Sequence, residues 1–478
     1  MNYELRITHC LSKGVIKVCK MQKYLAAALA LAIVFFGFVI IRVGIAKPST
    51  KFELAKIPDD QKLHAAAYKD AYPLQYNSFM KNNEAAPSPT GYGGSLPHVS
   101  YLEEQPEMLE NFKGYKFAVQ YDVARGHTYA GEDFVTTLRL PPQKGSCITC
   151  KGSYMYDVYF KQSGWEYASK PIAEVIAPMQ ADDWFGCATC HDPDTMQLRV
   201  YQQGFVEAMA RRGVDVNNAP HNDMRGYVCG QCHNEYYFTA EDGRVNHPWD
   251  NGFDPESEFQ FYQSGQCGAF PGDWKHPDSG AMMLKAQHPE FDNWVTSVHH
   301  DAGVTCVDCH MPYMRENGQK YTSHWMTNPL KTTEQSCLKC HDESTETLIA
   351  RVKTINDNMF KLQRIAGQTC AQAHLTIQAA AAAGATDEQL AEARLLIREG
   401  QWYWDWACAE NSYGFHNTDK LMKACALSID CAHRAIESAK VLAPNAPLAP
   451  MPVYVEAEHW NAAQHPGVEP PTAEQPAM

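Results

Sequence analysis

The chain has 478 residues, including 17 Cys and 20 His, and its formal charge is −14 because 55 Asp and Glu outnumber 41 Lys and Arg. With 45% apolar and 20% charged residues, it has the composition of a globular protein of about three domains and not of a disordered chain. The acidic balance argues against nucleic-acid binding, which requires a basic face.

A basic stretch followed by an apolar run opens the chain. Several Lys and Arg precede apolar residues 25–41, and Gly44-Ile45-Ala46 offers a small-x-small cleavage site. This pattern is typical of an export signal, and the run is also just long enough for an uncleaved membrane anchor. We therefore expect residues 1–46 to be a signal peptide or signal-anchor, with Met21 as an alternative start, and the mature chain to lie outside the cytoplasm.

The segment that follows has little periodicity. Residues 47–120 are rich in Tyr, Pro, Asn and Gly, which predicts coil with short helices. Strand signals are scarce along the whole chain.

Four strings with the pattern Cys-x-x-Cys-His follow, although chance would give roughly 0.03 of them in a chain of this composition. The pattern is typical of c-type haem attachment: two thiols three positions apart bind both vinyl groups of one porphyrin, and the adjacent imidazole lies beneath the iron as proximal ligand. Zinc ribbons, the alternative, do not need His after each second Cys. The strings are Cys187, Cys190 and His191; Cys229, Cys232 and His233; Cys306, Cys309 and His310; and Cys337, Cys340 and His341.

An earlier string, Cys147-Ile-Thr-Cys150-Lys151, has lysine where the others have histidine. A lysine amine, with an ordinary pKa of about 10.4, must lose its proton to bind iron, so metal and burial must displace that proton together. We predict a fifth haem on Cys147 and Cys150 with Lys151 as proximal ligand. A disulfide, or a haem whose ligand lies elsewhere, is the alternative. Residues 47–343 would then form one pentahaem catalytic region.

The pattern becomes helical after residue 343. We predict helices over about 344–383, ending at Gly384, over 386–411 and over 418–440. This long-helix region, residues 344–441, packs internally or against a second subunit, and a dense aromatic patch at residues 402–406 packs against haem or helix. Apolar residues alternate at spacings of four and three to form one seam, made of Leu348, Val352, Ile355, Met359 and Leu362.

The C-terminal segment and the remaining cysteines carry less information. Eight prolines in residues 444–478 predict that residues 442–478 are a low-complexity tail. Cys425 and Cys431 lie about 9 Å apart along one helix, beyond disulfide reach. Five cysteines of the mature chain lie outside the haem strings, so at least one is a free thiol or pairs between chains; they are Cys267, Cys370, Cys408, Cys425 and Cys431.

The order of one Cys-x-x-Cys-Lys and four Cys-x-x-Cys-His resembles the pentahaem, ammonia-forming cytochrome c nitrite reductases. The resemblance extends from about residue 121 to residue 417 and is highly specific, because the lysine variant singles out this family among multihaem cytochromes. Other matching strings are Arg125-Gly-His127-Thr-Tyr129, Thr137-Leu-Arg139, Glu235-Tyr236-Tyr237-Phe238, Lys285-Ala-Gln287-His288-Pro289, Cys309-His310-Met-Pro312 and Gly414-Phe-His416.

The resemblance also implies the distal ligands. Electron-transfer haems take two strong axial ligands, and the family pattern assigns this second role to His127, His299, His324 and His416. The sequence leaves open which distal histidine serves which haem. The lysine-ligated haem has no distal ligand left, and an open iron position is where a substrate binds.

Three further residues correspond to the family's nitrite-flanking positions. Arg139 offers a fixed cation to an anion and to charge on a departing oxygen. His288 has an ordinary pKa near neutral, which suits proton delivery, and Tyr236 offers a hydroxyl. Without the resemblance, a salt bridge, a core histidine and a packed aromatic would be the preferred interpretations.

The resemblance implies one calcium ion beside the active haem. Calcium prefers oxygen ligands. Glu235 would supply a carboxylate and Gln287 an amide, whereas Tyr236 and Lys285 would supply backbone carbonyls. The ion would tie two segments together and add positive charge, which helps an anion enter an acidic protein.

We therefore expect a mainly α multihaem cytochrome c fold with closely packed haems, little β structure and long C-terminal helices. By resemblance, its function is the six-electron reduction of nitrite to ammonium in the periplasm, by a homodimer. The electron donor would be a membrane tetrahaem quinol dehydrogenase or a soluble multihaem cytochrome. The rivals are a non-catalytic electron carrier, in which His98 or His221 closes the fifth haem, and a related sulfite- or hydroxylamine-converting multihaem enzyme.

Overall fold

The computed structural model describes residues 31, 56–96, 99–139, 143–180 and 183–452. Residues 56–478 form one unit and residues 1–55 another. The predicted export signal, His98 and most of the C-terminal tail lie outside the described residues. Within the described part of the chain, no helix has the length and hydropathy needed to cross a membrane.

Short helices joined by loops make up the described part of residues 56–343, and none of the α-helices described there exceeds ten residues. The α-helices are α2 (Pro73–Met80), α3 (Tyr101–Glu104), α4 (Glu107–Asn111), α5 (Ala130–Thr136), α6 (Lys161–Ser163), α7 (Ile172–Ile176), α8 (Cys187–Cys190), α9 (Gln203–Arg211), α10 (His221–Gly230), α11 (Pro255–Gln263), α12 (Glu290–Trp294), α13 (Val298–Asp301) and α14 (Cys306–His310).

Tighter or wider single turns connect these helices. They are η1 (Asp59–Gln61), η2 (Ala65–Tyr68), η3 (Lys81–Asn83), η4 (Lys116–Ala118), η5 (His127–Tyr129), η6 (Gly145–Ile148), the π-type turn η7 (Met155–Phe160), η8 (Gly164–Ser169), η10 (Val216–Asn218), η11 (Trp249–Asn251), η12 (Pro329–Thr332) and η13 (Cys337–Lys339).

Strands are few and short, as predicted. Each of the four described sheets has two antiparallel strands. The longest pair, β7–β8, closes through Asn317 (φ 49°) and Gly318 (φ 82°), which suit a two-residue turn with positive φ at both positions. The pairs are β1 (Ala86–Pro87) with β2 (Gly94–Ser95), β3 (Tyr237–Phe238) with β4 (Val245–Asn246), β5 (Trp274–Lys275) with β6 (Met282–Met283), and β7 (Tyr313–Glu316) with β8 (Gln319–Thr322).

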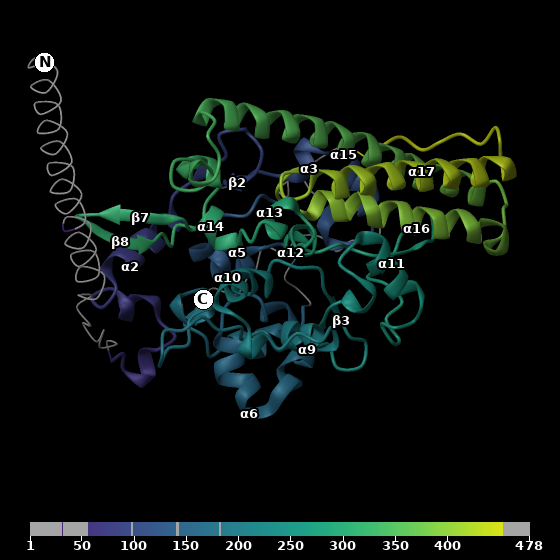
Figure 1. Cartoon of the computed structure of the whole chain (residues 1–478). Coiled ribbons are helices and arrows are strands. Elements are labelled where there is room, and N and C mark those ends of the chain that lie inside the picture. Colours follow the sequence, from purple (N-terminus) through teal and green to yellow (C-terminus); the bar gives the residue numbers. More distant parts are fainter. Residues whose placement is uncertain (1–30, 32–55, 97–98, 140–142, 181–182, 453–478) are drawn as a thin grey trace, which may run out of the picture. The chain divides into compact units, whose positions relative to one another are not determined.

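Three long helices complete the fold: α15 (Thr345–Ala382), α16 (Asp387–Ala409) and α17 (Thr418–Leu442). They pack on one another and lie side by side in Figure 1. Side-chain oxygens of Ser344, Thr386 and Asn417 accept from the first-turn amides, which is why each helix begins there. The three predicted helices are therefore present within two residues at each end.

The aromatic patch forms the core of this bundle. The indoles of Trp402, Trp404 and Trp406 are fully buried and donate hydrogen bonds to protein acceptors, the Trp404 bond being 3.1 Å to the carbonyl of Gln363. A Cβ on Gly367 would lie 2.6 Å from Nε1 of Trp404, so only glycine permits this close approach. The patch thus packs against protein.

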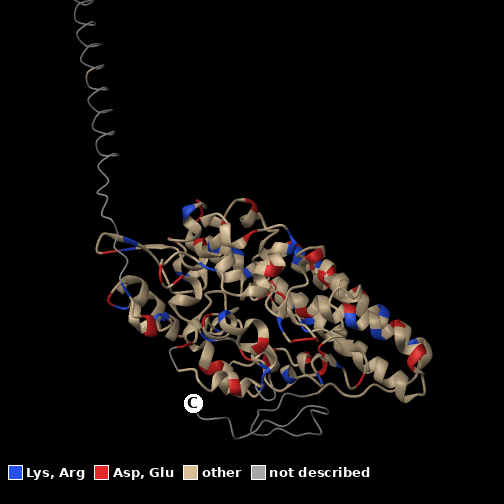
Figure 2. Cartoon of the chain, turned by 90° about the horizontal axis from the view of Figure 1, so that it is seen from below, with Lys and Arg blue, Asp and Glu red and all other residues tan. Residues whose placement is uncertain are grey.

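The residues of the predicted helical seam have different surroundings at the two ends of the seam. Leu348, Val352 and Ile355 line a large internal cavity, whereas Met359 is buried in the core. All the described cysteines are unpaired, including Cys425 and Cys431. Figure 2 shows acidic and basic positions interspersed along the chain.

Candidate functional site

One continuous cavity of about 2490 Å³ contains all five cysteine motifs. A site for one small ligand measures about 300–1,000 Å³, so this cavity has room for several. The motifs reach it from η6, α8, the end of α10, α14 and η13. Porphyrins attached to those cysteines fit this space.

The histidines of the motifs face four other histidines across the cavity. The distances between ring centroids are 6.1 Å for His191–His324, 5.9 Å for His233–His127, 6.2 Å for His310–His416 and 6.4 Å for His341–His299.

This spacing fits one metal ion between each pair of rings. With a metal–imidazole bond of about 2 Å and a ring centre about 1 Å beyond the nitrogen, two axial rings have centroids about 6 Å apart. The structure thus places each predicted proximal histidine opposite one predicted distal histidine. It therefore indicates which distal histidine belongs to which motif, a pairing that the sequence left open.

Several of these rings are oriented by their second nitrogen. Nδ1 of His191 donates to the carbonyl of Met196 at 2.9 Å, and Nδ1 of His310 donates to that of Thr327 at 3.0 Å. Nδ1 of His416 lies 2.5 Å from a buried carboxylate oxygen of Glu410. With Nδ1 engaged, Nε2 is left to face a metal, and the ring is held in place.

The first motif, Cys147–Lys151, has a lysine where the other four have a histidine. Lys151 lines the same cavity, and its amine lies 6.0 Å from the ring centre of Phe134. Among the described residues, the four distal histidines are all engaged with other motifs. His221, one candidate to close this site, is the exposed first residue of α10 and also lines this cavity, but none of the four histidine pairs includes it.

Arg139, Tyr236 and His288 line the same cavity as Lys151. Nε of Arg139 donates to Thr137 at 3.3 Å, and its guanidinium lies 4.2 Å from the ring centre of Phe117. Cys147 and Cys150 lie close enough to Tyr236 to affect its pKa, and Lys151 lies close enough to His288 to lower the pKa of its imidazole. Both residues therefore lie near the lysine motif.

Burial changes the acid–base properties expected of this site. Although His288 faces the cavity, surrounding protein desolvates its ring and lowers its pKa to about 4. Its imidazole is thus neutral at pH 7, where the sequence led us to expect titration. Burial also raises the pKa of Tyr236 well above its usual value and lowers that of Arg139.

The predicted calcium ligands lie on two adjoining segments. A carboxylate oxygen of Glu235 accepts from the backbone amide of Gln287 at 2.6 Å, and the backbone amide of His288 donates to the carbonyl of Asn234 at 3.3 Å. The side-chain amide of Gln287 donates to the carbonyl of Lys285 at 3.0 Å. The two segments are therefore held against each other at the site.

The charge around Glu235 fits a cation. Glu235 is fully buried, and this burial is the main reason why its pKa lies well above the usual value. The nearby carboxylates of Asp292 and Asp273 raise the pKa further. A divalent cation would compensate this buried negative charge. The side chain of Lys285 is bound to Asp405 at 2.8 Å, so this residue could offer the ion only its backbone carbonyl. For Gln287 to offer oxygen, its amide must rotate.

Sequence reasoning missed several supporting residues. Glu290 lies 3.6 Å from Nδ1 of His233, and Glu410 orients His416. Both are buried carboxylates next to a ligand in space. The sequence signal that could have identified these two carboxylates is their closeness to predicted site residues. Glu290 is two residues after His288, and Glu410 is six residues before His416.

Comparisons with known proteins agree with this geometry. The family model described as cytochrome c552 matches residues 64–476. Cytochrome c nitrite reductase subunit NrfA from Nitratidesulfovibrio vulgaris is 37% identical over 414 residues, which cover 79% of this chain and 79% of that protein. Cytochrome c-552 from Bacteroides fragilis is 34% identical over 406 residues, covering 81% and 78%.

A solved structure is similar as well. The catalytic subunit (NrfA) of cytochrome c nitrite reductase from Desulfovibrio desulfuricans matches with a TM-score of 0.74 and 36% identity, covering 79% of this chain and 86% of that chain. The mainly α multihaem fold expected from the sequence is thereby confirmed. The chain belongs to the cytochrome c552 family.

Proposed function

We propose that this chain is a nitrite reductase that carries five c-type haems and forms ammonium. The observation that carries the proposal is the cavity itself: four motif histidines each face a second histidine, whereas Lys151 has no such partner among the described residues. Arg139, Tyr236 and His288 line the same cavity. The similar proteins from Nitratidesulfovibrio vulgaris and Desulfovibrio desulfuricans are both named cytochrome c nitrite reductase, which supports nitrite as substrate.

The proposed reaction consumes one nitrite, six electrons and eight protons and yields one ammonium and two waters. Cys147, Cys150 and Lys151 would hold a haem whose iron would supply the electrons and a place for the substrate to bind. The chain's own residues must bind an anion, deliver protons and keep partly reduced nitrogen species from leaving.

Anion binding falls to Arg139. Its guanidinium stays charged in proteins, and its bond to Thr137 and its packing on Phe117 fix its position. A fixed cation in a site that excludes water stabilises nitrite and the charge that develops on a departing oxygen.

Proton handling falls to His288 and Tyr236. A neutral His288 donates one N–H to a substrate oxygen and can take up a proton at its other nitrogen, returning it as the substrate is reduced. The Tyr236 hydroxyl stays protonated because burial raises its pKa, so it acts as a donor. Both groups therefore lie on the proton route.

Electrons would reach the Lys151 site along the row of attachment loops. The thiols of Cys150 and Cys232 lie within hydrogen-bond reach, as do those of Cys229 and Cys306. Cys309 in turn lies near Cys337. This order links the first, third, fourth and fifth motifs, which suits a six-electron reaction that needs stored electrons near the site.

We assign one calcium ion to Glu235, the Gln287 amide and the carbonyls of Tyr236 and Lys285. Calcium would neutralise the buried Glu235 charge and fix Tyr236. The Desulfovibrio desulfuricans catalytic subunit has two calcium sites, which supports calcium in this fold.

The cellular setting completes the proposal. We infer export by residues 1–46, action in the periplasm and a homodimer formed by the long-helix region, residues 344–441. The donor would be a membrane tetrahaem quinol dehydrogenase or a soluble multihaem cytochrome.

A product count tests the function. Purified holoprotein receives electrochemically reduced viologen and nitrite, and the viologen oxidised and the ammonium formed are measured. Six electrons per nitrite with full recovery of ammonium is the expected result. Fewer electrons with release of nitric oxide would contradict the ammonium product, and no turnover in fully loaded protein would favour the electron carrier.

A further inference from the structure

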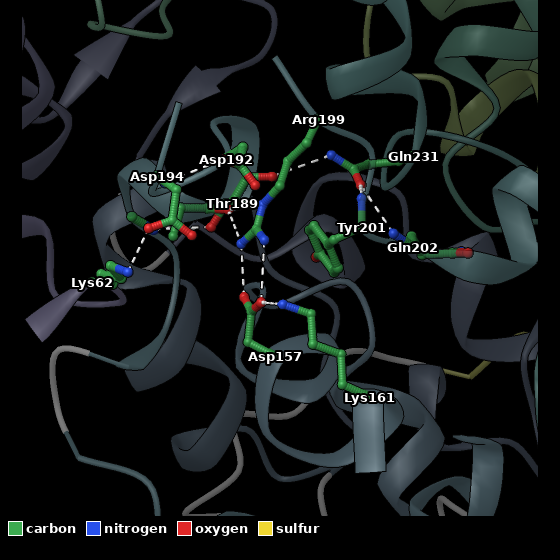
Figure 3. A network of polar contacts seen from close by, with 12 residues as sticks. Lys62, Asp157, Lys161, Thr189, Asp192, Asp194, Arg199, Tyr201, Gln202 and Gln231 are labelled. Carbon is green, nitrogen blue, oxygen red and sulfur yellow. Dashed lines mark hydrogen bonds and ion pairs between the residues drawn. The ribbon is translucent and has the colours of Figure 1, made fainter. Parts of the chain in front are cut away.

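A four-residue segment, Arg199–Gln202, contacts three of the five attachment loops (Figure 3). It follows the second motif in the chain, and the backbone amide of Arg199 donates to the carbonyl of Cys190 at 2.9 Å. Haem-binding loops are otherwise short turns without a sheet or long helix to hold them.

The first contact is made by Arg199 on the second motif. Its Nε donates to the carbonyl of Ala188 at 2.9 Å, between Cys187 and Cys190. The same guanidinium binds both carboxylate oxygens of Asp157, at 3.1 Å and 2.7 Å. This fork anchors the second loop to η7, at whose far end Lys161 also contacts Asp157.

The second contact is made by Tyr201 on the first motif. Its hydroxyl donates to the carbonyl of Thr149 at 3.1 Å, one residue before Cys150 and two before Lys151. The same oxygen lies 3.6 Å from the sulfur of Cys232 in the third motif. The Tyr201 side chain is only 1% exposed, so no water replaces this bond.

The third contact is made through Gln231, which lies inside the third motif. Its side-chain oxygen accepts from the backbone amides of Tyr201 and Gln202, at 2.9 Å and 3.2 Å. Its nitrogen donates to the carbonyl of Val228 at 3.1 Å and to that of Thr189, in the second motif, at 3.4 Å. Gln231 is fully buried, so every polar atom of its amide is engaged by protein.

The network continues from Gln202 to the segment that carries Tyr236. The side-chain nitrogen of Gln202 donates to Nε2 of His247 at 3.4 Å, and Nδ1 of His247 donates to the carbonyl of Glu235 at 2.8 Å. Glu235 immediately precedes Tyr236. One segment thus reaches both the loop that carries Lys151 and the loop that carries Tyr236.

We propose that Arg199–Gln202 is an internal clamp and that Tyr201 is a positioning residue for the lysine-ligated site, fixing the Cys147–Lys151 loop relative to the Cys229–His233 loop. The clamp holds the two loops at a fixed spacing and so would fix the positions of Cys147, Cys150 and Lys151 around the group that they would hold. This inference rests on the proposed function in assigning a haem to Cys147 and Cys150 with Lys151 as its ligand.

A substitution of one atom tests the clamp. Tyr201→Phe keeps the ring and removes the hydroxyl that holds Thr149. Tyr159→Phe is the matched control, because its hydroxyl also donates to a backbone carbonyl, that of Val175 at 3.2 Å, but Val175 belongs to none of the motifs.

The readouts are taken on holoprotein. Haem content is measured by mass spectrometry. The spin state of the iron at the Lys151 site is followed by electron paramagnetic resonance, and its midpoint potential by a reductive titration without nitrite. We expect Tyr201→Phe to keep five haems, to shift the resonance and the potential of the lysine-ligated iron, and to lower kcat at least threefold with KM within twofold. Tyr159→Phe should match the wild type in all of these.

Two results would overturn the clamp. One is a Tyr201→Phe protein whose resonance, potential and kcat coincide with those of the wild type, whatever its thermal stability. The other concerns a Tyr201→Phe protein that lacks part of its haem. Equal haem loss over all five motifs in peptide maps would contradict the clamp, whereas loss confined to Cys147 and Cys150 supports it. Because the spectra need no nitrite, a wild type that formed no ammonium would refute the function and leave this test intact.

Discussion

The loop region that carries the five motifs and the bundle of α15, α16 and α17 are held together in different ways. In the bundle, Trp402, Trp404 and Trp406 pack among alanines contributed by all three helices. Around the motifs, two smaller clusters of buried side chains flank a 2490 Å³ cavity. There the loops are connected by side chains that bind backbone carbonyls.

This difference indicates which part of the molecule depends on its cofactors. The bundle buries its own apolar surface and can be stable without them. The loop region encloses a space that only bound groups can fill. The sequence reflects the contrast, because heptad-like spacing marks the bundle and cysteine spacing marks the loops.

The largest expected effect comes from withholding haem. Without haem, water would contact the apolar lining of this cavity, and proteins are stable by only about 5–15 kcal/mol, so the loop region should lose its stable fold. We expect the apo-chain, made without haem attachment, to keep protected amides in α15–α17 and to exchange rapidly over residues 121–341. Hydrogen exchange measures this, and uniform protection over both regions would contradict the comparison.

Within the loaded loop region, the largest effect should come from Arg139. Arg139→Gln removes the fixed cation, and we expect kcat/KM for nitrite to fall about 100- to 1,000-fold, or about 3–4 kcal/mol of transition-state stabilisation. The thermal midpoint should hardly change, because the side chain lines the cavity and supports no core.

The matched control is Arg244→Gln. Arg244 is a partly exposed arginine whose guanidinium pairs with Asp242, and its loss should leave kcat/KM unchanged. If Arg139→Gln retained wild-type kcat/KM with all haems present, the proposed anion site would be wrong.

The same contrast explains what could be predicted from the sequence. Ser344, Thr386 and Gly384 fix helix ends through local chemistry, so the bundle could be predicted almost to the residue. The motifs, and the four distal histidines implied by the resemblance, could be named as well. The pairing of His299 with His341 could not, because it depends on how loops far apart in the chain come together.

Two further features were beyond local reasoning. The neutral state of His288 follows from desolvation by segments distant in the sequence, so its ordinary pKa was a poor guide. The contacts of Tyr201 and Gln231 join three motifs through carbonyl groups, which leave no mark in residue spacing. In the loop region the sequence therefore predicts ligands better than it predicts their supports.

A smaller effect is expected from Gly367 in the bundle. Gly367→Ala would place a Cβ 2.6 Å from Nε1 of Trp404 and 3.0 Å from Glu107. Overpacking of this kind costs about 1–3 kcal/mol, more than the 0.5–1 kcal/mol that alanine gains over glycine in a helix. Hydrogen exchange of α15–α17 amides measures the loss, and the haem spectra should not change.

Gln368→Ala provides the control for this substitution. Gln368 is the exposed neighbour of Gly367 on the same helix, so its variant should be as stable as the wild type. A Gly367→Ala variant more stable than the wild type would show that Trp404 can move aside, and that the bundle is less tightly packed than its geometry indicates.

The smallest effect should be a pH dependence confined to the bundle side. Glu110, on α4 beneath α15, is fully buried, and burial raises its pKa to about 8, although Lys113 at 3.7 Å opposes the shift. A raised pKa in the folded state favours folding while the carboxyl stays protonated. That contribution is complete below the unfolded value of about 4.3 and is lost progressively up to about pH 8.

Glu110→Gln removes this titration. The variant should therefore gain stability relative to the wild type as the pH rises from 5 to 8, by about 1–3 kcal/mol, given about 1.4 kcal/mol for each pKa unit and a discount for Lys113. Glu103→Gln, at an exposed position on α3, should show no such trend. Exchange of the α15–α17 amides at pH 5, 6.5 and 8 reports the difference. A parallel change in amides of the haem loops would mean that the two regions unfold as one unit, because only a shared transition carries a bundle carboxyl's titration to loops held by cofactors.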